Sequence, residues 1–141
     1  MPNKKIVIDT NVLISALIGK GYSKQILKEI FINRNIFLCI SDICLEEFEK
    51  VLAYKHLAKY QGIQAEGKIL PDGIKTFGII YNPSTNLTIL KDSSDNKFLE
   101  LALEAKADYL ITGNKLHFTQ KEYLGIKIKS PKEFWEELKH L

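Results

Sequence analysis

The sequence predicts an α/β fold, a sandwich in which helices flank a mainly parallel sheet. Its 141 residues suit a single domain, spanning 1–141, that is long enough to bury a sizeable core. Residues 6–8 are β-branched and do not alternate with polar residues, as expected of a strand that is buried on both faces. Strand-like runs of this kind alternate with helical patterns along the chain, which is typical of parallel sheets.

The N-terminal part of the chain supplies two strands and their first connections. After the strand at 6–8, residues 9–11 (Asp-Thr-Asn) favour a helix start, and an apolar helix is expected at 12–18. Ser23 is expected to cap the next helix, and the run at 36–40 to form the second strand.

The helix after the second strand carries three acids on a mostly polar surface. Ser41 and Asp42 open this helix. Its apolar face comprises Leu45, Phe48 and Leu52. With that face turned inward, we expect Glu46 and Glu49 at the surface and Glu47 at the edge of the apolar stripe.

The middle of the chain predicts further helix at 54–81, with interruptions near Gly62, Pro71 and Gly73. A loop begins at Pro83, and residues 87–90 are a candidate for a short third strand. This part of the sequence has the weakest periodicity.

The C-terminal part predicts a helix, two strands and a final helix. The cluster Asp-Ser-Ser-Asp at 92–95 precedes a strongly periodic helix. The strands are expected at 109–112 and 126–128. Ser130 to Glu133 form a capping box with proline at the first helical position, and the helix that they start is expected to run through Leu138.

The composition permits a nucleic-acid partner without demanding one. The net charge is +3 with a pI near 8.7, and Arg34 is the one arginine in the sequence. Cys39 and Cys44 form no metal or disulfide motif, so a reducing cytoplasm is the expected compartment. No signal-peptide pattern and no apolar run of membrane-spanning length is evident, so no membrane association is expected.

Polar residues follow several of the predicted strands, where an α/β sheet places its functional site. Asp9, Ser41, the acids at 92 and 95, and residues 112–114 all occupy such positions. Carboxylates that converge on one site repel each other, and a hard cation such as Mg²⁺ or Mn²⁺ relieves that repulsion. A cation of this kind activates water and polarises a phosphoryl oxygen, so phosphodiester hydrolysis is the chemistry that this set favours.

Each acid also has a purely structural interpretation. Asp9 is well placed to cap a helix, as are Asp92 and Asp95, and for any one of them taken alone capping is the better explanation. His117 has neither a cysteine nor a second histidine at ligand spacing, so a zinc site is not expected.

Other enzyme classes fit the sequence less well. It contains no GxSxG elbow, no P-loop and no GxGxxG. A dehalogenase-type phosphatase needs Asp-x-Asp after its first strand, and Asn11 stands at the second of these positions. The acids are also spaced differently from those of a receiver domain.

Four blocks in order resemble the PIN-domain ribonuclease family, and in particular its toxin-component branch. They are VIDTNVLISAL, SDICLEEFEKVL, LKDSSDNKFLELALEAKADYLITGNKLHF and IKIKSPKEFWEEL. The resemblance covers nearly the whole chain. It implies a three-layer sandwich around a five-stranded parallel sheet in the order 3-2-1-4-5, and metal-dependent cleavage of RNA with Mg²⁺ or Mn²⁺ as cofactor.

The resemblance also implies roles for individual residues. Asp9, Glu47 and Asp95 match the catalytic metal ligands, and Asp92 matches an accessory acid. Asn11 and Thr112 match polar residues that support these ligands. Asn114 stands where many members have a fourth acid, so we expect one tight metal site rather than two.

The basic side chains are the candidates for RNA contact. The lysines considered are Lys20, Lys91, Lys97, Lys115 and Lys121. By sequence position, Lys115, and with less support Lys91, are expected near the acids, so Lys115 is the candidate RNA-binding residue.

Two further functions remain as alternatives. One is a non-catalytic PIN-like module that binds RNA or a protein, and the other is a nuclease acting on DNA flaps, which ranks low because the chain is short. If the protein is the toxin of a toxin–antitoxin pair, an antitoxin protein is its expected partner, together with an RNA substrate and a second copy in a homodimer.

Overall fold

The computed structural model describes residues 3–83, 93–113 and 121–140, with the backbone alone for 93–95. The described strands are β1 (Lys4–Ile8), β2 (Ile36–Ile40), β3 (Ile79–Ile80), β4 (Tyr109–Ile111), β5 (Glu122–Tyr123) and β6 (Ile126–Lys129). The described helices are α1 (Thr10–Ile18), α2 (Tyr22–Ile32), α3 (Asp42–Leu52), the 3₁₀ turn η1 (Lys55–Leu57), α4 (Gln61–Glu66), α5 (Leu70–Phe77), α6 (Ser93–Ala105) and α7 (Pro131–Leu138).

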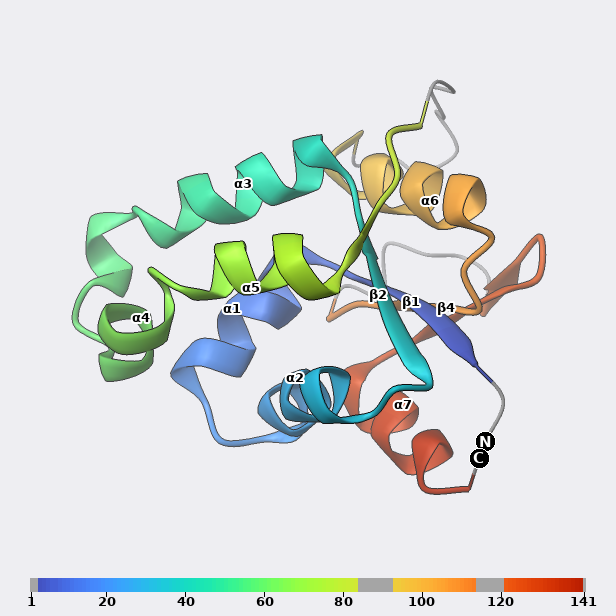
Figure 1. Ribbon diagram of the computed structural model, residues 1–141, viewed down its shortest axis with the longest axis horizontal. Helices are drawn as coiled ribbons and strands as arrows, with labels where there is room; N and C mark the ends of the chain where they lie inside the picture. The colour runs from blue at the N-terminus through green and yellow to red at the C-terminus, as the bar shows by residue number, and fades with distance from the viewer. Residues whose placement is uncertain (1–2, 84–92, 114–120, 141) are drawn as a thin grey trace.

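The strands form one sheet in the order β3-β2-β1-β4-β6-β5. The first five strands of this order are parallel to one another, and β5 pairs antiparallel with β6 at the edge. Figure 1 shows α6 on one side of the strands and α2 with α7 on the other, which gives three layers. The predicted α/β sandwich with a parallel 3-2-1-4-5 sheet is therefore confirmed, with a sixth, antiparallel strand in addition.

The chain order of the strands places a switch point beside β1. The chain runs from β1 outward to β2 and β3, and then returns to the other side of β1 for β4. In α/β sheets, the connections that leave the carboxyl ends of the strands on either side of such a reversal run to opposite faces, and the crevice between them leaves room for a site.

Several details differ from the sequence predictions. The third strand is β3, inside the segment expected to be helix, because its pairing with β2 outweighs the local helical pattern. Gly21, rather than Ser23, is the N-cap of α2, and Ser23 lies within the helix. Gly73 also lies inside a helix, α5, and does not interrupt it. The strand expected at 87–90 lies outside the described residues.

The core lies on both faces of the central strands. Ile6 and Val7 are both fully buried, as their lack of alternation predicted. Gly62 permits α4 to approach α1 closely, because a Cβ atom at this position would lie 1.7 Å from the backbone oxygen of Leu17. The first helix, α1, is thus packed closely against the middle segment.

The last helix begins as predicted. Ser130 accepts a hydrogen bond from the Glu133 backbone N–H at 3.2 Å, and the Glu133 carboxylate accepts one from the Ser130 N–H at 2.9 Å. Tyr109 of β4 donates a hydrogen bond to Glu137 at 2.8 Å and ties α7 to the sheet.

None of the helices in the described part of the chain combines the length and the apolar composition that a membrane crossing requires.

Candidate functional site

Asp9 lies at the carboxyl end of the central strand, beside Thr112. The register pairs Ile8 with Ile111, so the next residue of each strand lies next to the other. The Asp9 backbone N–H donates to the Ile111 carbonyl at 3.1 Å and continues this pairing by one residue. The sheet itself therefore brings Asp9 and Thr112 together at the switch point.

The Asp9 carboxylate is held by hydrogen bonds on both oxygens. Its Oδ1 accepts from the backbone N–H of Val12 at 2.9 Å, which makes Asp9 the N-cap of α1. Its Oδ2 accepts from the hydroxyl of Thr112. Asp9 is only 3% exposed. The capping interpretation is thus confirmed, and each oxygen still has a lone pair for a further partner.

Thr10 connects the first helix, α1, with Glu47 of α3. Its hydroxyl donates to Glu47 Oε2 at 2.8 Å, although the two residues are 37 positions apart in the chain. Because Thr10 follows Asp9 directly, this bond places the Glu47 carboxylate beside the residue next to Asp9 in the chain. Sequence reasoning treated Thr10 only as one of three residues favouring a helix start, and no local pattern indicated its partner.

Lys97 of α6 is the second partner of Glu47. Its Nζ lies 2.8 Å from Glu47 Oε1, and the two side chains are 24% and 28% exposed. By sequence position only Lys115 and Lys91 were expected near the acids, so the expectation for Lys97 was wrong. The reason is that α6 begins at the same end of the sheet as α3, which is a property of the topology.

The three glutamates of α3 have the predicted orientations. Ser41 caps the helix by accepting a hydrogen bond from the Cys44 N–H at 3.1 Å. This start leaves Glu46 and Glu49 exposed and Glu47 half-buried. The edge position of Glu47 that the apolar stripe predicted is confirmed.

A cysteine nucleophile is not available beside these acids. Cys44 lies three residues before Glu47 and is buried. Burial raises the pKa of its thiol to about 11, which disfavours the thiolate form.

The remaining predicted site residues are placed only in part. Asp95 is the third residue of α6, so the helix starts before it rather than after it. Its side chain is not among those that the structure describes. Asn11 is exposed on the first turn of α1. Asp92, Asn114 and Lys115 lie outside the described residues.

The side chains present fit a hard divalent cation. Asp9 and Glu47 offer carboxylate oxygens, the ligands that Mg²⁺ and Mn²⁺ prefer. Within residues 3–83, 93–113 and 121–140, no three His, Cys, Asp or Glu side chains gather closely enough to hold a metal ion. The third carboxylate that the family resemblance implies is that of Asp95, whose side chain is not among those described.

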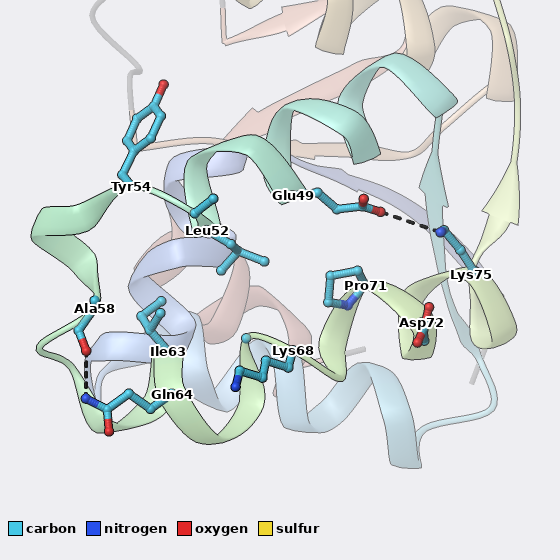
Figure 2. Close-up of a pocket in the computed structure, with 12 residues that line it drawn as sticks. Glu49, Leu52, Tyr54, Ala58, Ile63, Gln64, Lys68, Pro71, Asp72 and Lys75 are labelled. Carbon is cyan, nitrogen blue, oxygen red and sulfur yellow. Dashed lines mark hydrogen bonds and ion pairs between the residues drawn. The ribbon is translucent and has the colours of Figure 1, made fainter.

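Asp9 and Glu47 do not line the cavity that is shown in Figure 2. That cavity, about 490 Å³ in volume, lies among the C-terminal end of α3, η1, α4 and α5. Figure 2 shows Glu49 paired with Lys75 across it, with Nζ and Oε1 separated by 3.5 Å. Glu49 therefore belongs to a different face of α3 from Glu47.

Comparison with known proteins gives three results. A family model described as PIN domain matches residues 5–116. Uncharacterized protein MJ1680 of Methanocaldococcus jannaschii is 38% identical over 142 residues, covering 94% of this chain and 90% of that protein. A chain from the crystal structure of VapBC2 from Rickettsia felis, bound to a DNA fragment from their promoter, is similar in fold, with a TM-score of 0.57. That match has 18% sequence identity and covers 89% of this chain and 98% of the other.

Proposed function

The chain belongs to the PIN domain family, and on that premise we propose that it is a metal-dependent endoribonuclease that hydrolyses phosphodiester bonds in RNA. The observation that carries this proposal is the bridge from Asp9 through Thr10 to Glu47. It unites two carboxylates, from separate elements, at the carboxyl end of the central strand.

The roles of the described residues follow from their hydrogen bonds. Thr112 and the Val12 N–H fix the Asp9 carboxylate, and Thr10 fixes that of Glu47. Asp9 and Glu47, together with Asp95 from the family resemblance, would hold Mg²⁺ or Mn²⁺, which supplies charge neutralisation and water activation when bound. Ligands fixed in advance do not have to be reoriented when the cation binds.

The other predicted residues complete the proposal. Asp92 acts as an accessory acid, and Asn114 adds an amide oxygen without charge. Asn11 supports the ligands from the first turn of α1, and Lys115 contacts an RNA phosphate. These assignments rest on the family resemblance.

The test of this proposal is RNA cleavage by the purified protein with and without Mn²⁺. Asp9→Asn removes the charge at nearly constant shape and is expected to abolish the metal-dependent cleavage. Asp72→Asn makes the same chemical change at an exposed position in the first turn of α5, and it is expected to cleave like the native protein. Cleavage that survives Asp9→Asn would refute the proposed site, and no cleavage by the native protein would favour the non-catalytic module.

We further propose that the protein acts in the cytoplasm as the toxin of a toxin–antitoxin pair, as a homodimer inhibited by an antitoxin protein. The fold similarity to a chain of the VapBC2 structure supports this branch of the family. Expression of the native chain is expected to arrest growth, and expression of Asp9→Asn is not. Equal growth with both chains would remove the toxin assignment while leaving the nuclease proposal open to the cleavage test.

A further inference from the structure

Lys97 and Glu47 form an ion pair between α6 and α3. The distance from Lys97 Nζ to Glu47 Oε1 is 2.8 Å, and about three quarters of each side chain is shielded from solvent. The Lys97 ammonium also lies 5.6 Å from the centre of the Phe98 ring, which adds a favourable cation–π contact. The lysine is thus held against the site and is not a freely solvated surface charge.

The two oxygens of Glu47 have different partners. Oε2 accepts a hydrogen bond from the neutral hydroxyl of Thr10 at 2.8 Å, and Oε1 faces the positive charge of Lys97. A hydroxyl donor leaves the negative charge of the carboxylate in place, whereas an ammonium balances it. A divalent cation that approaches Glu47 therefore meets a like charge already bound at Oε1.

We propose that Lys97 is a positioning residue that competes with the divalent cation for Glu47. In the metal-free protein, Lys97 orients the carboxylate and balances its charge, and metal binding replaces this pair. The inference rests on the proposed function, because it takes Glu47 to be a metal ligand.

The proposal predicts tighter metal binding when the lysine charge is removed. Lys97→Met keeps most of the aliphatic stem and is expected to lower the Kd for Mn²⁺ about two- to fivefold, the factor that corresponds to a modest ion pair. Lys97→Arg keeps the charge and is expected to restore the native Kd. The measurement is calorimetric titration of the full chain with Mn²⁺ in the absence of RNA, with circular dichroism to verify that each variant is folded.

The chain offers a matched control in a second ion pair whose acid also lies on α3. Lys75 pairs with Glu49 of α3 at 3.5 Å, and these side chains are 54% and 44% exposed. Lys75→Met removes a lysine charge from a pair whose acid, Glu49, lies two residues beyond Glu47 on α3. The Kd of this variant for Mn²⁺ is expected to equal the native value. An equal decrease in Kd for both methionine variants would mean that overall charge is responsible, and would overturn the role of Lys97.

Measurements on a Glu47→Gln variant distinguish a failure of this inference from a failure of the proposed function. Glu47→Gln is expected to weaken Mn²⁺ binding, and adding Lys97→Met to it is expected to change nothing further. If Glu47→Gln binds Mn²⁺ as tightly as the native protein, the metal site itself has been assigned wrongly. If Glu47→Gln weakens binding but Lys97→Met leaves the Kd unchanged or raises it, only the competition by Lys97 is overturned.

Discussion

At the scale of single residues, Asp9 is both the observed cap of α1 and the proposed metal ligand. Its Oδ1 caps α1 through Val12, and its Oδ2 accepts the Thr112 hydroxyl. The cap interpretation and the metal-ligand interpretation therefore do not exclude each other. The cap fixes the orientation that a ligand would need.

Thr10 offers a direct test of the link between the two acids. Thr10→Val preserves shape but removes the donor to Glu47, whereas Thr10→Ser retains the hydroxyl. Since a hydrogen bond to a charged group contributes about 1.5–3 kcal/mol, we expect Thr10→Val to lower kcat/KM for RNA by at least about tenfold. Thr10→Ser should stay close to the native value, and native activity in Thr10→Val would show that the bridge is dispensable.

The two thiols are expected to be inert in the folded protein. Cys39 and Cys44 are buried, and burial raises the pKa of each to about 11. At neutral pH a thiol reagent should therefore label neither cysteine in native protein and both after unfolding. Rapid labelling of the native chain would contradict this burial.

At the scale of elements, the sequence predicted those whose signals are local. The capping box at Ser130 and the apolar run at 36–40 carry their structure in a few adjacent residues, and both predictions are confirmed. The two-residue strand β3 was missed because it is defined by its pairing with β2. Thr10 and Lys97 were missed for a related reason, since each meets Glu47 only through the packing of distant elements.

Two glycines that lie inside helices, Gly62 in α4 and Gly73 in α5, predict opposite effects of substitution by alanine. Gly62→Ala would place a Cβ atom 1.7 Å from the Leu17 backbone oxygen, so α1 and α4 must separate. We expect the free energy of unfolding to fall by about 1–3 kcal/mol, as for other overpacked sites.

Gly73→Ala is the control for this prediction. A Cβ atom at position 73 of α5 would lie 3.8 Å from the ring of Phe31 in α2, which is an ordinary van der Waals contact. Here we expect unchanged or higher stability, by up to about 1 kcal/mol, because alanine favours a helix interior. Urea unfolding measures both variants, and a stable Gly62→Ala would contradict the close packing.

At the scale of the whole molecule, the C-terminal helix closes the fold against both α2 and the sheet. Glu137 of α7 accepts the Tyr109 hydroxyl at 2.8 Å and lies 3.4 Å from the Lys129 ammonium. Burial pushes the pKa of this carboxyl upward, but the Tyr109 hydrogen bond and the nearby lysines together lower it below its ordinary value. The helix is thus attached by an ionised group.

This attachment predicts a pH dependence of stability. Because the Glu137 pKa is lower in the folded than in the unfolded chain, its contribution is complete above the unfolded pKa and is lost as pH falls through the folded pKa. Tyr109→Phe should lower the free energy of unfolding by about 1 kcal/mol near neutral pH, with a smaller difference in acid. Urea unfolding across this pH range measures the effect, and a difference that grows in acid would contradict it.

The central claim is that Asp9 and Glu47 belong to one divalent cation site. Calorimetric titration of the native chain and of Asp9→Asn with Mn²⁺ tests this claim most directly. We predict one tight Mn²⁺ per chain in the native protein and its loss in Asp9→Asn. Two equivalent tight sites would contradict the single site, and undiminished binding by Asp9→Asn would contradict the site itself.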